Sequence, residues 1–424
     1  MALGQLKSAI KACKPLFAVL RPAVQAVRRW KKSAPRRMYA AQREQNWKIQ
    51  SAKGLTSEQI GVPQKSFQDV FGYLQSTPNS GVEVDRLHEA YFPQLPALIT
   101  DGSEPHWRFE TRRNIEEQAH YVVNVPQGRV FGEAMTPILP GDAILLDESW
   151  EFDLKDIYEK DIFQRVHLGD PELIDGKVAL LGTYGDDNYF HWMIHTLPRL
   201  DLLRRSCFGE GIDFFVVHET SKRFMKETLE ILGIKESQLI NIRERPHLKS
   251  RELLVPTTPS INGLVPQFAC QFLKENIPAK DGFSVGERIY ISRETAGFRK
   301  VLNEEEVVDF LRPFGFEKVV MDQYSVAEQA AIHKHAKVIV SPHGANLTNI
   351  AFCEPGTKLV EIFAPNFVPM CYWRMAFHAG LQYGYMLGEG ENKNLELSHR
   401  NAMDDITVDT KRLTRVMSNM GISS

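Results

Sequence analysis

The chain has 424 residues, of which 43% are hydrophobic and 25% are charged, a composition typical of a folded globular protein and not of a disordered or fibrous one. It contains no apolar run of about 18 residues, which argues against a membrane-spanning helix. Its five scattered cysteines form no CxxC pair, which argues against a disulfide framework or a zinc site and fits a reducing compartment. Since one domain usually holds roughly 100 to 200 residues, the length predicts two domains plus extensions.

The first segment, residues 1–43, is a basic arm. It carries eleven Lys or Arg and no Asp or Glu, whereas the rest of the chain has 40 basic and 53 acidic side chains. Apolar residues at helical spacing from Leu3 to Val27 predict an amphipathic helix lying on an anionic membrane surface, so we expect a cytoplasmic protein held peripherally on that face. Pro15 and Pro22 would interrupt the helix. A transit peptide or a disordered arm that binds an acidic partner are the alternatives.

Residues 44–256 are predicted to form an N-terminal Rossmann-like domain. Short β-like runs from 118 to 148, separated by Pro-Gly turns, predict a small antiparallel layer. Its turn residues Asp142, Asp147 and Glu148 are expected to cap turns, not to catalyse. From 177 to 256 strands alternate with helices, one of them spanning 189–205, which predicts a parallel sheet. Residues 257–287 are predicted to be an interdomain linker.

Residues 288–385 are predicted to form the second Rossmann-like half, with four strands and three helices. Strands are expected at 288–292, 316–321, 338–341 and 358–363, and capping boxes at Asn303 and Ser325 open two of the helices. Residues 386–424 form a tail with no assigned partner. The predicted fold is therefore α/β, with two Rossmann-like domains facing each other across a cleft.

A turn of small residues at 342–346 lies between a buried strand and a short helix. Such a turn leaves backbone N–H groups at the carboxyl edge of a sheet, where phosphates bind. Arg293, Arg299 and Lys300 follow the first strand of the same half and are suited to clamp a diphosphate. Glu361 ends the last strand and is suited to accept hydrogen bonds from a ribose diol. The alternatives are an ordinary strand-to-helix connection, a solvated basic loop and a carboxylate in a salt bridge.

In the first half, His191 and His195 are four residues apart on one predicted helix face. A neutral imidazole there can act as a general base near pH 7, whereas the alternative is a histidine packed beside Trp192. A zinc site is not predicted, because no third ligand is evident. Asp187 is a weaker candidate for orienting one of the histidines.

Three segments carry a resemblance to a known family: NYFHWMIHTLPRL (188–200), IYISR (289–293) and SPHGANLTNIAFCEPGTKLVEIF (341–363). Together they resemble glycosyltransferase family 61, of the kind found in bacterial capsule or polysaccharide biosynthesis. The resemblance implies the two-Rossmann-domain architecture called GT-B. It also implies an inverting transfer from a nucleotide sugar, commonly UDP-linked, with no cofactor and no obligatory metal. The expected acceptor is a glycan or lipid-linked glycan, and nucleic acid is not an expected partner.

The resemblance also assigns roles to single residues. It places a set around the donor diphosphate and ribose: Arg293, His343, Gly344, Ala345, Asn346 and Glu361. It places a second set on the acceptor side: Asn188, His191 and Trp192. Many relatives carry an acid where this chain has His195, so His195 or His191 is expected to take the acceptor proton. A GT-B nucleotide-sugar epimerase and a non-catalytic glycan-binding scaffold subunit are the alternative functions.

Overall fold

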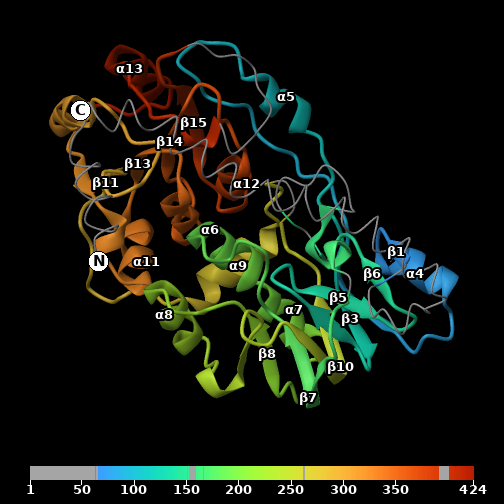
Figure 1. Ribbon diagram of the computed structural model, residues 1–424. Helices are drawn as coiled ribbons and strands as arrows, with labels where there is room; N and C mark the ends of the chain where they lie inside the picture. Colours follow the sequence, from blue (N-terminus) through green and yellow to red (C-terminus); the bar gives the residue numbers. More distant parts are fainter. Residues whose placement is uncertain are drawn as a thin grey trace, which may run out of the picture.

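The computed structural model describes residues 63, 65–149, 151, 159–165, 167–260, 263–390 and 401–424. Within these residues the chain is a mixed α/β structure with two sheets and a helical layer between them (Figure 1). The predicted arm at 1–43 lies outside the described residues. Among the described residues, no helix is both long and apolar enough to cross a lipid bilayer.

The larger sheet has ten strands in the order β1-β6-β5-β4-β10-β7-β8-β9, with β3 also pairing to β10 and β2 to β3. Its strands are β1 (Lys65–Phe67), β2 (Glu83–His88), β3 (His120–Pro126), β4 (Arg129–Phe131), β5 (Thr136–Leu139), β6 (Ala143–Leu145), β7 (Glu172–Leu180), β8 (Phe214–Val217), β9 (Leu239–Asn241) and β10 (His247–Pro256). Only β10-β7-β8-β9 forms the predicted parallel series. The antiparallel strands β3 and β4 pair directly with β10, so the predicted separate β layer is part of the same sheet.

The smaller sheet is wholly parallel, with the order β12-β11-β13-β14-β15. Its strands are β11 (Arg288–Ile291), β12 (Glu317–Val319), β13 (Val338–Pro342), β14 (Lys358–Phe363) and β15 (Gln382–Leu387). The predicted four strands are confirmed, and β15 was not predicted. This is the doubly wound order 2-1-3-4-5, in which the chain reverses its direction of travel between β11 and β13.

Helices cover both faces of the smaller sheet. Those on the face toward the larger sheet are α11 (Val326–His335), the 3₁₀ helix η7 (Ala345–Phe352) and α12 (Cys371–His378), whereas α10 (Glu304–Leu311) and α13 (Thr410–Asn419) cover the opposite face. The Ser325 capping box is confirmed, because its side chain accepts from Glu328 N–H and Glu328 returns a bond to Ser325 N–H. The tail therefore packs on the smaller sheet through α13.

The predicted helix at 189–205 is broken into three pieces. It consists of α6 (Tyr189–His191), a π-helical turn η3 (Trp192–Thr196) and α7 (Arg199–Arg205). The Leu197 N–H bonds to the Trp192 carbonyl, five residues back, and Pro198 begins α7. Such π turns widen the helix locally and occur often at functional sites. Helix α8 (Arg223–Ile231) follows β8 as predicted.

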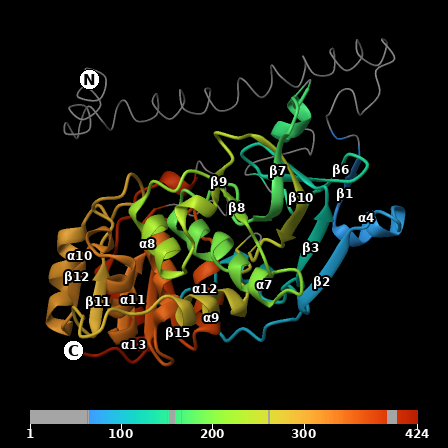
Figure 2. The same ribbon diagram turned by 90° about the horizontal axis from the view of Figure 1, so that it is seen from below.

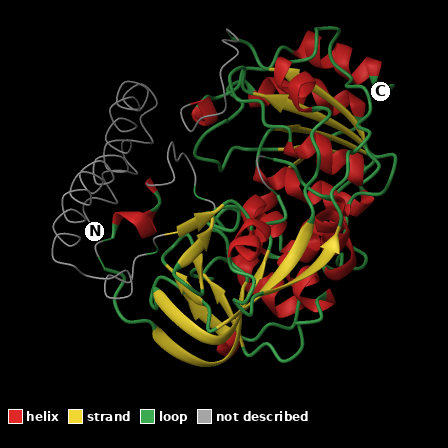
Figure 3. Ribbon diagram, turned by 90° about the vertical axis from the view of Figure 1, so that its right-hand side faces the viewer, coloured by secondary structure: helices red, strands yellow, loops and turns green. Residues whose placement is uncertain are grey.

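One hydrophobic core joins the two sheets. It includes Trp192 and Leu254 from the larger sheet and its helices, and Ile339 and Trp373 from the smaller half. Helix α9 (Gln267–Asn276) lies inside this core, so the predicted linker contains a packed helix. Figures 2 and 3 show helices between the two groups of strands, and Figure 2 labels α9 and α12 among them.

The chain before β3 also contacts the smaller sheet. Ile99 forms a bridge with Gly384 of β15, and helix α5 (Trp107–Arg112) places Phe109 against Trp373. Behind it, buried Glu117 accepts a hydrogen bond from Arg374 of α12 at 3.0 Å. Helix α4 (Val70–Ser76), in contrast, packs on the far face of the larger sheet. The segment before residue 118 therefore supports both sheets.

Candidate functional site

The candidate donor site lies where the smaller sheet reverses its strand order. The loops that follow β11 and β13 meet at this edge, and ligands of doubly wound sheets bind at such a reversal. These loops carry the predicted residues Arg293 and Arg299 on one side and His343 and Gly344 on the other. The structure therefore brings most of the predicted donor set together.

Both arginines of the first loop are buried. Arg293 donates from Nε to the Arg299 carbonyl at 3.1 Å and from Nη2 to the Phe298 carbonyl at 2.9 Å. Arg299 donates from Nε to the His343 carbonyl at 3.2 Å. Burial lowers the pKa of Arg293, and burial together with the Arg293 charge lowers the pKa of Arg299 to about 10. The value for Arg299 leaves its guanidinium charged at neutral pH, and arginine side chains in proteins stay protonated in general.

Carbonyl oxygens hold these two cations in place. In the described parts of the chain, neither Arg293 nor Arg299 forms an ion pair with a carboxylate. Buried charges normally have a partner of opposite sign, because burial removes the stabilisation that water provides. The pair therefore leaves positive charge at this edge that an anionic ligand would neutralise.

Gly344 makes room for the Arg293 guanidinium. A Cβ at this position would lie 1.8 Å from Arg293 Nη1, far inside any contact distance. The glycine is extended, with φ −177°, so space and not backbone conformation requires it. Gly344 also precedes η7, whose first N–H groups have no acceptor within the helix and no side-chain cap. Ala345 and Asn346 are half-buried in this first turn.

His343 forms a buried pair with Glu361. Its Nδ1 lies 2.5 Å from Glu361 Oε1, and Tyr383 donates to Glu361 Oε2 at 2.6 Å. Burial raises the pKa of Glu361 to about 8. Burial, with Arg299 and Arg293, lowers the pKa of His343 well below its ordinary value. The carboxyl group and the imidazole therefore share one proton at neutral pH. If Glu361 holds it, the carboxyl donates to Nδ1 and the neutral ring carries its hydrogen on Nε2; if His343 holds it, both ring nitrogens carry hydrogen. In either case His343 Nε2 is a hydrogen-bond donor.

Glu361 is completely buried, and both of its oxygens form hydrogen bonds with protein side chains. In this structure its function is to hold the imidazole of His343, and its predicted contact with ribose stays a prediction. Lys300 is half-buried and directs its Nζ to the Glu294 carbonyl at 2.7 Å. Its ammonium therefore does not join the two buried guanidinium groups.

Aromatic rings connect the donor site to the predicted acceptor side. The ring of Tyr372 lies 5.2 Å from His343 and 5.8 Å from Phe190, measured between centroids. Phe190 lies 5.4 Å from His191 and 5.5 Å from His195. The two predicted groups, which are far apart in sequence, are therefore separated by only two aromatic side chains.

His191 and His195 form a pair on the π-helical turn. Their Nδ1 atoms are 3.1 Å apart, so one nitrogen donates and the other accepts. Burial lowers the pKa of His191 to about 4 and that of His195 well below its ordinary value. Both rings are neutral at pH 7. His191 is half-buried whereas His195 is 4% exposed, so His191 is the one that can reach a substrate.

Three other predicted residues have structural contacts instead. Trp192 is fully buried and donates its indole N–H to Thr228 at 2.8 Å, and its expected place on the acceptor side stays a prediction. Asn188 caps α6 by accepting from Phe190 N–H. Asp187 is exposed and lies 3.8 Å from Lys222.

One protein-family model matches the part of the chain that holds most of these residues. The family model described as Glycosyltransferase 61 matches residues 189–360, from the first residue of α6 into β14. This region belongs to glycosyltransferase family 61. No curated protein matches the chain. The family 61 match contains the histidine pair, both buried arginines and the turn at His343, and ends one residue before Glu361.

Sequence reasoning missed two buried polar sites of this chain. Asp186, next to the predicted Asp187, bonds His218 Nδ1 at 2.8 Å, and His218 Nε2 lies 2.7 Å from the Glu133 carbonyl. Since both ring nitrogens face acceptors, the doubly protonated ring fits best, and these bonds outweigh burial and raise the pKa of His218. In the sequence, only the two adjacent acids Asp186 and Asp187 drew attention to the position of this buried pair.

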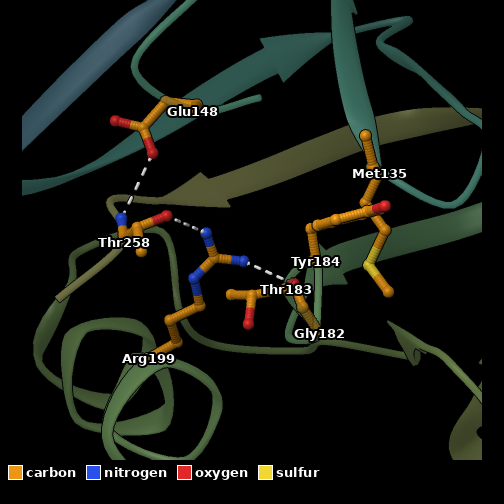
Figure 4. A pocket seen from close by; sticks show the side chains of 8 residues that line it. Met135, Glu148, Gly182, Thr183, Tyr184, Arg199 and Thr258 are labelled. Carbon is orange, nitrogen blue, oxygen red and sulfur yellow. Dashed lines mark hydrogen bonds between the residues drawn. The ribbon is translucent and has the colours of Figure 1, made fainter. Parts of the chain in front are cut away.

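The second missed group is a pocket in the larger sheet (Figure 4). It contains Glu148, which was expected to cap a turn, and Arg199. Both are buried, and burial raises the pKa of Glu148 to about 7. Nothing in the local sequence distinguishes the buried Glu148 from the adjacent Asp147, which is half-buried. Among the described residues, no three or more His, Cys, Asp or Glu side chains gather to form a metal site.

The raised pKa of Glu361 predicts how stability depends on pH. The folded state holds this proton more tightly than the unfolded chain, so the contribution of Glu361 is full below pH 4.5 and is lost as pH rises through about 8. Glu361→Gln removes the titration. We expect the free energy of unfolding of wild type to fall relative to the variant by about 2 kcal/mol or more between pH 5 and 9.

Urea denaturation at several pH values measures this difference. The matched control is Glu354→Gln, a half-exposed glutamate just after η7, whose effect should be small at every pH. A constant difference between wild type and Glu361→Gln across the range would contradict the prediction.

Proposed function

We propose that this family 61 glycosyltransferase is an inverting enzyme that moves a sugar from a nucleotide diphosphate donor, with UDP the expected nucleotide, to a hydroxyl of a glycan or lipid-linked glycan. Its two halves would work as a GT-B pair, with the donor on the smaller sheet. The observation that carries the proposal is the pair of buried guanidinium groups, Arg293 and Arg299, at the strand reversal.

The leaving diphosphate gains negative charge as the glycosidic bond breaks. Arg293 and Arg299, with the N–H groups at the start of η7, are placed to stabilise that charge before it develops, so no reorganisation is needed. His343 would add a hydrogen bond from Nε2, because Glu361 fixes its ring through Nδ1. This arrangement supports a reaction without an obligatory metal, since protein cations supply the positive charge.

The attacking hydroxyl must lose a proton. We assign this proton to His191, whose Nε2 accepts when its Nδ1 donates to His195. The imidazolium that forms then keeps its Nδ1–H bond to the neutral His195 ring, which makes His195 a positioning residue. The lowered pKa of His191 keeps it neutral, and so able to accept a proton, down to about pH 4.

Donor binding tests the arginine pair. We expect UDP and UDP-sugars to raise the melting temperature of the protein, with or without EDTA. Arg293→Ala should weaken UDP binding about 10- to 100-fold, because a charge-assisted hydrogen bond contributes about 1.5–3 kcal/mol. Gly344→Ala should weaken it as well, since the new methyl group displaces the Arg293 guanidinium.

Arg312→Ala is the matched control, because Arg312 is an exposed arginine paired with Asp309 in the same half. It should bind UDP as wild type does. GDP-, CMP- and dTDP-sugars tested in parallel identify the base. If no nucleotide shifts the melting temperature of wild type, the donor site is wrong.

The base assignment predicts a split between chemistry and binding. His191→Ala should lower kcat about 10²- to 10⁴-fold while the UDP melting shift stays unchanged. His195→Ala should lower kcat less, because it removes only the orienting contact. Initial rates of UDP release with each UDP-sugar and a glycan acceptor panel measure this. Equal kcat values for wild type and His191→Ala would contradict the assignment.

We also propose that residues 1–43 bring the enzyme to the anionic cytoplasmic face of a membrane, where a lipid-linked acceptor would be found. The support is their charge, eleven basic and no acidic residues. Full-length protein should sediment with phosphatidylserine vesicles and be released by salt. A chain that starts near residue 45 should stay in solution, and equal sedimentation of both chains would overturn the proposal.

A further inference from the structure

The larger sheet has its own reversal of strand order. The chain runs from β7 to β8 and β9 in one direction and then places β10 on the other side of β7. The pocket of Figure 4 lies where β7 and β10 end, lined by Gly182 and Thr183 after β7 and by Thr258 after β10. Such a position is where open α/β sheets bind ligands, and the donor site of the smaller sheet has the same placement.

A carboxyl group and a guanidinium group line this pocket, and each is held by its own hydrogen bonds. Glu148 Oε2 accepts from the Thr258 N–H at 3.2 Å, whereas Arg199 donates from Nη2 to the Thr258 hydroxyl at 2.8 Å and from Nη1 to the Gly182 carbonyl at 2.7 Å. Both charged residues are described, and no ion pair joins them. Figure 4 shows Thr258 between the two side chains.

Arg199 has N–H donors that its hydrogen bonds within the protein do not use. It is 4% exposed, and its guanidinium carries five N–H donors, of which these two hydrogen bonds use a part. Its buried Nε has no hydrogen-bond partner in the described structure. A buried donor without a partner costs free energy, which a polar ligand would recover. Burial lowers the pKa of Arg199 only to about 10, so the group remains a cation.

We propose that this pocket binds a hydroxyl group of the saccharide acceptor, a step that rests on the proposed function. A hydroxyl can accept from the Arg199 guanidinium and donate to the Glu148 carboxylate at once. Phosphates offer only acceptors and would face the carboxylate, and ammonium groups offer only donors and would face the guanidinium. The pocket is narrow and has room for a functional group, not a whole sugar ring.

The pocket is also close to the histidine pair. The Thr183 hydroxyl lies 3.3 Å from that of Thr196 on the π-helical turn, and Arg199 begins the helix that follows this turn. A sugar held here by one hydroxyl would lie along the same helical segment that carries His191. Met135 gives the pocket one apolar wall.

Saccharide binding by full-length protein tests the proposal. The probes are glucose, galactose, mannose, xylose and N-acetylglucosamine, each titrated to millimolar concentration and followed by saturation-transfer NMR. We expect at least one to bind saturably. Glu148→Leu keeps the volume but removes the acceptor, so it should weaken that sugar about tenfold or more, whereas UDP binding should not change.

Glu133→Gln is the control, because Glu133 is exposed and adjoins the pocket residue Ala134. It should bind sugar as wild type does. An unchanged UDP melting shift shows that Glu148→Leu is folded, and Arg199→Lys, which keeps the charge but loses the planar fork, should also weaken the sugar. Saturable binding that Glu148→Leu leaves intact, or no binding to wild type, overturns the pocket. A missing UDP response in wild type overturns the donor site separately.

Discussion

Two guanidinium groups buried side by side are the constraint around which the donor half is arranged. Their mutual repulsion and their removal from water both oppose folding, and main-chain carbonyls offset part of this cost. The loop accepts a further strain, since Arg299 has a φ of 53°, a region that side chains rarely adopt. Gly344 contributes by having no side chain. All of these features place positive charge where β11 and β13 end.

The position of the two halves follows from packing. A single core joins both sheets, and Tyr189 of α6 donates to Asn349 of η7, which in turn donates to Gln329 of α11. This buried chain of hydrogen bonds connects the segment that carries the histidine pair to the helix that begins at the donor turn. A displacement of either helix by an ångström would break it, so the relation between the two groups is fixed.

Local sequence patterns predicted most of the fold and part of the site. Apolar strands followed by small-residue turns predicted the smaller sheet and the loops with Arg293 and His343, because these depend on neighbours in sequence. Features that depend on distant contacts were not predicted. Strand β15 contains Tyr383, Gly384 and Tyr385 in place of a continuous apolar run. The π turn differs from an α-helix by one extra residue in the turn, which leaves the apolar pattern of the sequence almost unchanged. The burial of Glu148 and of Trp192 is likewise set by segments far away in the chain.

Charge balance explains why a proton matters at the donor site. Each phosphate of a nucleotide sugar carries negative charge, and Arg293 with Arg299 supplies two positive charges to match. The His343–Glu361 pair stays neutral overall as long as it retains its proton, so it adds a hydrogen-bond donor without altering this balance. Were Glu361 an ordinary ionised carboxylate, it would cancel one guanidinium and leave His343 Nε2 as an acceptor facing an anion. The burial that raises the pKa of Glu361 is thus what makes this side of the site compatible with a diphosphate.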